Sequence, residues 1–209
     1  RDRRPLLQSY VDVAVLRDVI ERHGVSNPVA LRWLQRHLLG APTSPFSIQK
    51  FYDSLKSQGL PVAKDTLHAF LSYLEDAFLI RTTSILTASE RQRMVNPRKC
   101  YPIDPGLITL YERTARSNLG HAFETAVLIE LLRRDCQVDY LRTPNGHEVD
   151  FHTIDPEGRT QLIQVCADAT DGATFDREIR SLVEAKVQHP NARAILMLLN
   201  PLPGRPETP

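Results

Sequence analysis

An apolar run at the end of the sequence, Ala194-Ile195-Leu196-Met197-Leu198-Leu199, follows directly on a segment with helical spacing at 174–188. The run has the length and composition of a buried strand, and the segment before it has apolar residues three and four positions apart. A strand after a helix implies a crossover that joins parallel strands of one sheet. This end of the chain therefore predicts an α/β domain.

The preceding residues extend the pattern. The further elements that the sequence predicts are a helix at about 117–134 and strands at about 137–142, 147–153 and 160–167. The order αβββαβ matches the common core of restriction-endonuclease-like folds. We therefore predict a restriction-endonuclease-like domain over residues 117–200 and a disordered, proline-rich tail over 201–209.

Residues 1–116 have mainly helical patterns, so the chain is predicted to be α+β overall. Asn27-Pro28 and Ser47 are good helix starts, and another helix is expected from about Lys64 to Asp76. Strands are expected at 78–87 and 99–103, with a basic loop between them. A pair of helices followed by a two-stranded wing predicts a winged-helix-like domain.

A winged-helix unit suggests contact with nucleic acid. Residues 1–116 carry 17 Lys and Arg against 11 Asp and Glu, whereas residues 117–209 carry 9 against 14. The basic half is expected to attract phosphate, or else the acidic half of the chain. The candidate nucleic-acid-binding residues are of two kinds. Lys64, Thr66 and His68 lie on the helix expected from about Lys64 to Asp76, which is the second helix of the pair. Arg91, Arg93, Arg98 and Lys99 lie in the basic loop. Because Asp65 and Glu75 make the helix face acidic, the loop is the better candidate, and a protein partner is the alternative.

Polar residues of the second domain form a candidate catalytic site. In Glu148-Val149-Asp150-Phe151-His152, a period of two places the three polar residues on one face of the strand. Gln164 and Cys166 share a face of the next strand, and Glu124 lies beside an apolar stripe of the first helix. We predict that Glu124, Asp150 and Gln164 converge, with Glu124 and Asp150 as ligands of Mg²⁺. The alternative is an ordinary half-buried strand.

The spacing from Asp150 to Gln164-x-Cys166 has the form of a metal-dependent nuclease motif, Asp…(Asp/Glu/Gln)-x-Lys. A cysteine occupies the lysine position, and a neutral thiol supplies no positive charge. Gln164 offers an amide oxygen in place of a carboxylate, so Mg²⁺ would bind more weakly. Lys186 on the following helix could provide the missing cation. The sequence therefore predicts a degenerate nuclease site, with an active Mg²⁺-dependent nuclease as the alternative.

Other classes are excluded by what the sequence lacks. There is no phosphate-binding loop of the form GxxxxGK[ST], so no ATP site of that kind is expected in these residues. No apolar run is long enough to span a membrane. Cys100, Cys136 and Cys166 are widely spaced, which favours a reducing cytoplasm over a disulfide framework.

In several segments along its length, the sequence resembles the C-terminal region of prokaryotic AAA-type ATP-binding proteins. The matching segments are Ser9–Asp12, Leu16–Arg22, Lys64–Leu67, Tyr73–Ile80, Val95–Lys99, Tyr101–Leu107, Gly120–Glu124, Glu148–Phe151 and Leu162–Cys166. The resemblance implies an N-terminal ATPase domain upstream, then a winged-helix unit, then a nuclease-like domain, in which Glu124, Asp150 and Gln164 match the site. It also implies that a member with Cys166 at the lysine position has doubtful nuclease activity.

Together these observations predict a DNA-associated or regulatory module of an ATPase. An active Mg²⁺-dependent DNA nuclease is one alternative. The other is a protein-interaction module that docks on the ATPase domain.

Overall fold

The computed structural model describes residues 3–111, 119–170 and 172–200. The chain forms two compact units, the first within 1–82 and 96–117 and the second within 83–95 and 118–209. Residues 83–95, which the sequence assigned to the first domain, therefore belong by their contacts to the second unit. The predicted boundary at 116/117 and the predicted disordered tail lie outside the described residues.

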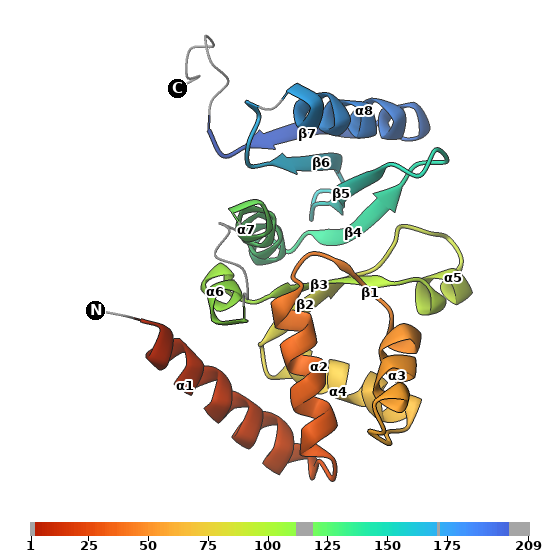
Figure 1. Ribbon diagram of the computed structural model, residues 1–209. Helices are drawn as coiled ribbons and strands as arrows, with labels where there is room; N and C mark the ends of the chain where they lie inside the picture. The colour runs from red at the N-terminus through yellow and green to blue at the C-terminus, as the bar shows by residue number, and fades with distance from the viewer. Residues whose placement is uncertain (1–2, 112–118, 171, 201–209) are drawn as a thin grey trace. The chain divides into compact units, whose positions relative to one another are not determined.

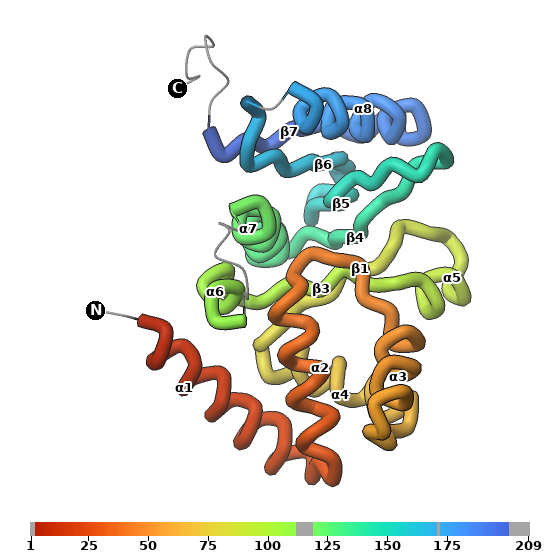
Figure 2. The backbone as a smooth tube through the Cα atoms, in the orientation of Figure 1, coloured from red at the N-terminus to blue at the C-terminus, as the bar shows by residue number. Residues whose placement is uncertain are grey.

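Helices make up most of the first unit (Figures 1 and 2). They are α1 (Arg4–Ala14), which continues as the π-helix η1 (Val15–Glu21), then α2 (Pro28–Gly40), α3 (Ile48–Ser57), α4 (Lys64–Asp76), the 3₁₀ turn η2 (Pro105–Leu107) and α6 (Ile108–Tyr111). The predicted starts of α2, α3 and α4 are confirmed. Their apolar stripes meet in one core that includes Leu34, Leu67 and Leu74, each fully buried.

Asn27 begins α2 and also ties it to the loop before α4. Its Oδ1 accepts a hydrogen bond from the Ala30 amide at 3.1 Å, and its Nδ2 donates to the Pro61 carbonyl at 3.1 Å. We expect Asn27→Ala to lower the free energy of unfolding by about 1 kcal/mol, because an orphan helix amide loses its acceptor. Urea denaturation measures this. Ser47→Ala is the comparison, and its effect should be smaller because the Ser47 Oγ cap of α3 is longer, at 3.4 Å. An equal or larger loss for Ser47→Ala would contradict this explanation.

A small sheet in the first unit has the order β1-β3-β2, formed by β1 (Pro45–Phe46), β3 (Arg98–Pro102) and β2 (Ile80–Thr83). The sequence predicted the two longer strands but not β1, which pairs antiparallel with β3. The predicted basic loop between β2 and β3 is not a simple loop, because it contains the helix α5 (Glu90–Val95).

The second unit contains a mixed four-stranded sheet. Its elements are α7 (Leu119–Arg133), β4 (Gln137–Arg142), β5 (Glu148–Ile154), β6 (Thr160–Cys166), α8 (Gly172–Gln188) and β7 (Arg193–Leu198). The strand order is β4-β5-β6-β7, with β6 and β7 parallel and the other pairs antiparallel. The predicted order of elements and the parallel crossover are confirmed. In Figure 1, α8 lies beside β6 and β7.

Two local features complete this sheet. Gly146, with φ of 85°, lies in the turn between β4 and β5, where the Thr143 amide donates to the His147 carbonyl at 2.8 Å. At the outer side of β4, the Tyr140 amide donates to the Ser84 carbonyl and the Leu86 amide donates to the Tyr140 carbonyl. Residues 84–86 therefore pair with the β4 edge of the sheet at Tyr140.

Candidate functional site

The candidate site lies where β5 separates from β6. The ladder between these strands runs from Ile154 opposite Thr160 to Phe151 opposite Ile163, and Asp150 follows immediately beyond it. At the same place the register of β5 against β4 shifts by one residue, as in a β-bulge. The strand is buried from Val149 through Thr153, so the alternative of an ordinary half-buried strand is wrong.

Glu148 is on the other side of this irregularity and does not belong to the site. Its carboxylate accepts a hydrogen bond from Arg142 at 3.2 Å, on the hairpin between β4 and β5. The sequence had placed Glu148 with Asp150 on one face. The bulge breaks the period of two on which that prediction depended.

Side chains replace the backbone ladder at the fork between β5 and β6. Gln164 Oε1 accepts a hydrogen bond from the Asp150 amide at 3.2 Å. Asp150 Oδ2 accepts one from the Val165 amide at 3.0 Å. Both side chains are buried, with 8% of Asp150 and 5% of Gln164 exposed. The structure thus brings Asp150 and Gln164 together, as their spacing predicted.

Helix α8 adds two residues that the sequence did not single out. Gln164 Nε2 donates to Glu178 Oε2 at 2.6 Å, and Arg177 Nη2 donates to Glu178 Oε1 at 2.6 Å. The Glu178 carboxylate beside it raises the pKa of Arg177. One signal could have identified Glu178: it stands four residues before Leu182, so it is a charged residue on the buried stripe of an amphipathic helix.

Cys166 is a buried neutral thiol. It is 3% exposed, its Sγ donates to the Asp168 carbonyl at 3.3 Å, and burial raises its pKa. The hypothesis that Lys186 supplies the missing cation is wrong. Lys186 Nζ donates to the carbonyls of Pro190 and Ala192. Lys186 also lies about 12 Å along α8 from Glu178, at a rise of about 1.5 Å per residue. The guanidinium that contacts this site is that of Arg177.

The metal prediction involves Glu124 on α7, whose side chain is half-buried. Among residues 3–111, 119–170 and 172–200, no group of three or more His, Cys, Asp and Glu side chains could hold a metal ion. The convergence of Glu124 with Asp150 on Mg²⁺ therefore stays a prediction. His152 is buried near His189, with 5.3 Å between the ring centroids, and burial lowers its pKa.

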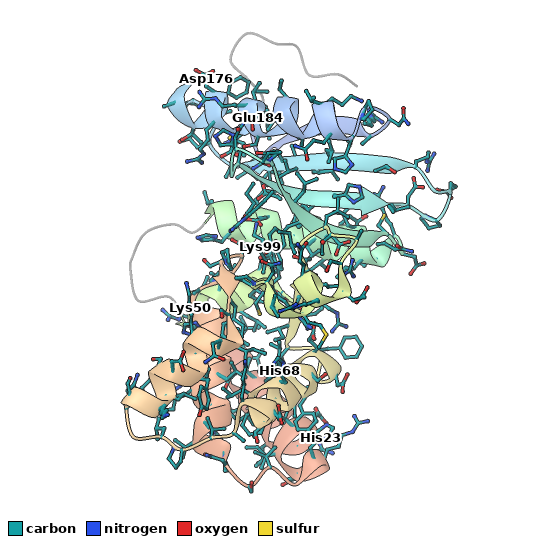
Figure 3. The ribbon with its side chains drawn as sticks, turned by 90° about the vertical axis from the view of Figure 1, so that its right-hand side faces the viewer. His23, Lys50, His68, Lys99, Asp176 and Glu184 are labelled. Atoms are coloured by element: carbon teal, nitrogen blue, oxygen red, sulfur yellow. The ribbon has the colours of Figure 1, made fainter. Side chains whose placement is uncertain are left out.

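The seven candidate nucleic-acid contacts are divided between the units. Lys64 and His68 are exposed on α4, while Thr66 and Arg98 are half-buried (Figure 3 labels His68). Lys99 is only 2% exposed, so the prediction that it contacts phosphate is wrong: a buried ammonium cannot reach a nucleic-acid backbone.

Arg91 and Arg93 lie on α5, in the second unit. Arg91 is exposed, whereas Arg93 Nη2 forms an ion pair with Asp139 at 3.4 Å. Desolvation by burial raises the pKa of Asp139.

These features define an α+β protein with two sheets and a buried polar network at the fork of the second. In the part of the chain that the structure describes, no helix has the length and hydropathy to cross a membrane. Residues 1–117 match the family described as a domain of unknown function (DUF8612), and the chain belongs to this family.

Two curated relatives share the sequence over longer stretches. Uncharacterized protein MJ1544 of Methanocaldococcus jannaschii is 29% identical over 187 residues, which cover 88% of this chain and 41% of that protein. An uncharacterized protein of Haemophilus influenzae is 27% identical over 146 residues, 70% of this chain and 36% of that protein. The chain thus spans less than half the length of the curated relatives that it matches.

Among solved structures, a crystal structure of the Vibrio cholerae ferric uptake regulator is similar at 10% identity. The match covers 86% of this chain and 94% of the regulator, with a TM-score of 0.29. A similarity at this level supports no conclusion about fold or function.

Proposed function

We propose that this chain is a DNA-associated or regulatory module from the C-terminal part of a prokaryotic AAA-type ATP-binding protein. In this proposal the first unit is winged-helix-like, and the second is a restriction-endonuclease-like domain that has lost nuclease activity. The αβββαβ order of the second unit and its parallel pair β6 and β7 support the nuclease-like ancestry. The curated relatives extend well beyond the matched region, which leaves room in them for an ATPase domain.

The hydrogen bonds of the Gln164 side chain are the main support for the proposed loss of nuclease activity. A metal-dependent nuclease needs oxygen ligands turned toward Mg²⁺ and a cation close to the reacting phosphate. Gln164 instead uses its oxygen for the Asp150 amide and its NH₂ group for Glu178. The cation at this network, Arg177, is held by Glu178. These groups serve as mutual hydrogen-bond partners, which is a structural role.

The proposal predicts DNA binding without cleavage. With Mg²⁺ or Mn²⁺ present, supercoiled plasmid should stay intact, while duplex binding should weaken steeply as salt rises, because Lys and Arg release counterions from phosphate. We expect Lys64→Ala to reduce the slope of log K against log salt by about 1, as for one lost phosphate contact. Fluorescence anisotropy at several salt concentrations measures this slope.

Lys50→Ala is the matched control, because Lys50 is also exposed but lies on α3, outside the candidate contacts (labelled in Figure 3). An unchanged slope in Lys64→Ala, or equal changes in both variants, would contradict the contact assigned to α4. Mg²⁺-dependent cleavage that Asp150→Ala abolishes would overturn the proposal and support the active nuclease.

A protein-interaction role has one observation in its favour. Leu6, Tyr10 and Val13 of α1 are 55%, 63% and 47% exposed, although the opposite face of the same helix is packed on the core through Val11. Apolar residues that line both faces of a surface helix suit a helix that also packs on another domain. Tight association with a separately expressed ATPase domain, without DNA binding, would favour this role.

A further inference from the structure

Among the described residues, the outer edge of β7 has no strand partner and carries apolar side chains. In the described part of the chain, β7 is hydrogen-bonded to β6 alone, whereas the β4 edge is bonded to residues 84–86 at Tyr140. After Arg193, β7 consists of Ala194 and four larger apolar residues, and each of them is exposed or partly exposed. Soluble proteins usually protect such an edge with lysine, proline or a bulge, none of which interrupts β7.

The neighbouring helix adds to this apolar surface. Ile179 and Val183 of α8 are 37% and 60% exposed, and they are one turn apart. Glu184 points the other way, because its carboxylate accepts a hydrogen bond from Thr143 and contacts His147 in the hairpin between β4 and β5. Ile179 therefore lies on the flank of α8 that is turned away from this hairpin and toward β7. Figure 3 labels Glu184 on this helix.

We propose that the β7 edge is the interface with a second copy of this chain. In the dimer, β7 pairs antiparallel with β7 of the other copy around a two-fold axis, and the two four-stranded sheets join into one. A two-fold axis lets the same unpaired amides and carbonyls of both copies satisfy each other. The flanks of α8 that carry Ile179 and Val183 then lie on the same face of the joined sheet.

Charge favours a second copy as the occupant. Because β6 and β7 are parallel, with Cys166 beside Leu198, Asp168 lies near the end of β7. Antiparallel pairing brings Arg193, at the start of β7, to that end of the other copy. The exposed Arg193 and Asp168 of the two copies then approach each other twice in one dimer, while the two Arg193 side chains stay at opposite ends.

The full chain tests this interface by sedimentation velocity over a range of concentrations. Ile195 lies near the middle of β7, so the two-fold axis brings both copies of it close together. We expect Ile195→Lys to raise the dissociation constant of the dimer roughly 10-fold or more, because like charges meet. An equimolar mixture of Ile195→Lys and Ile195→Glu chains should recover the dimer. Wild-type amides of 193–198 should exchange with deuterium more slowly as concentration rises.

Two further variants distinguish a weakened dimer interface from a general folding defect. Val183→Lys changes an exposed residue beside the interface and should also weaken the dimer, whereas Val29→Lys changes a residue of α2 that is 53% exposed and should leave the dimer unchanged. A wild-type chain that stays monomeric at every concentration would overturn the proposal. So would a dimer that Val29→Lys weakens and the substitutions at Ile195 and Val183 do not.

Discussion

Replacing Gln164 by leucine is expected to lower the free energy of unfolding by about 3 kcal/mol, although leucine is more hydrophobic and similar in size. The substitution removes the acceptor of the Asp150 amide and the donor to Glu178, both buried. A buried carboxylate that loses a hydrogen-bond partner is costly, because water cannot replace that partner. Urea denaturation followed by circular dichroism measures the difference.

Gln161→Leu is the matched control for this experiment. Gln161 lies on the same strand but is only half-buried, so its replacement should change the free energy of unfolding by no more than about 0.5 kcal/mol. If Gln164→Leu is as mild as Gln161→Leu, the network at the fork does not stabilise the second unit, and the structural role proposed for it fails.

Gln164→Glu is expected to produce a protein whose stability depends on pH. The new carboxylate would stand 2.6 Å from the Glu178 carboxylate, in place of the amide nitrogen. Two ionised carboxylates cannot share this contact, so the folded state should hold a proton between them and raise the pKa of the pair. We expect a loss of about 2 kcal/mol at pH 7 relative to wild type.

The raised pKa of the carboxylate pair decides whether the variant gains or loses stability as pH rises. The folded variant binds a proton that the unfolded chain releases above its ordinary carboxyl pKa, so stability falls as pH rises and returns as pH falls toward about 5. Denaturation of both proteins at pH 5, 6, 7 and 8 measures this dependence. A constant difference between them across this range would show that the two carboxylates do not interact.

The Gln164→Glu variant also tests whether this site can bind Mg²⁺. If the fork descends from a metal site, the carboxylate at position 164 should let Mg²⁺ raise the melting temperature of Gln164→Glu and not that of wild type, since a bound ligand stabilises the folded state. Equal shifts in the two proteins would indicate general ionic effects.

The elements of this protein follow from local sequence. Helix α2 starts where Asn27-Pro28 predicted, because a cap is made by residues three positions apart and needs no distant partner. The strands β4, β5 and β6 were predicted to within about two residues for the same reason, because apolar periodicity is a local signal.

The site depended on tertiary structure. That Asp150 and Gln164 lie together could be predicted from the strands, but the bulge in β5 that excludes Glu148 could not, because strand register is set by both neighbours of a strand. The partnership of Gln164 with Glu178 joins a strand to a helix that begins after it in the chain, and only the packing of α8 on the sheet decides it. Likewise, Lys99 and Lys64 are the same residue type in the sequence. Only the tertiary structure shows that Lys99 is buried and that Lys64 is exposed to solvent.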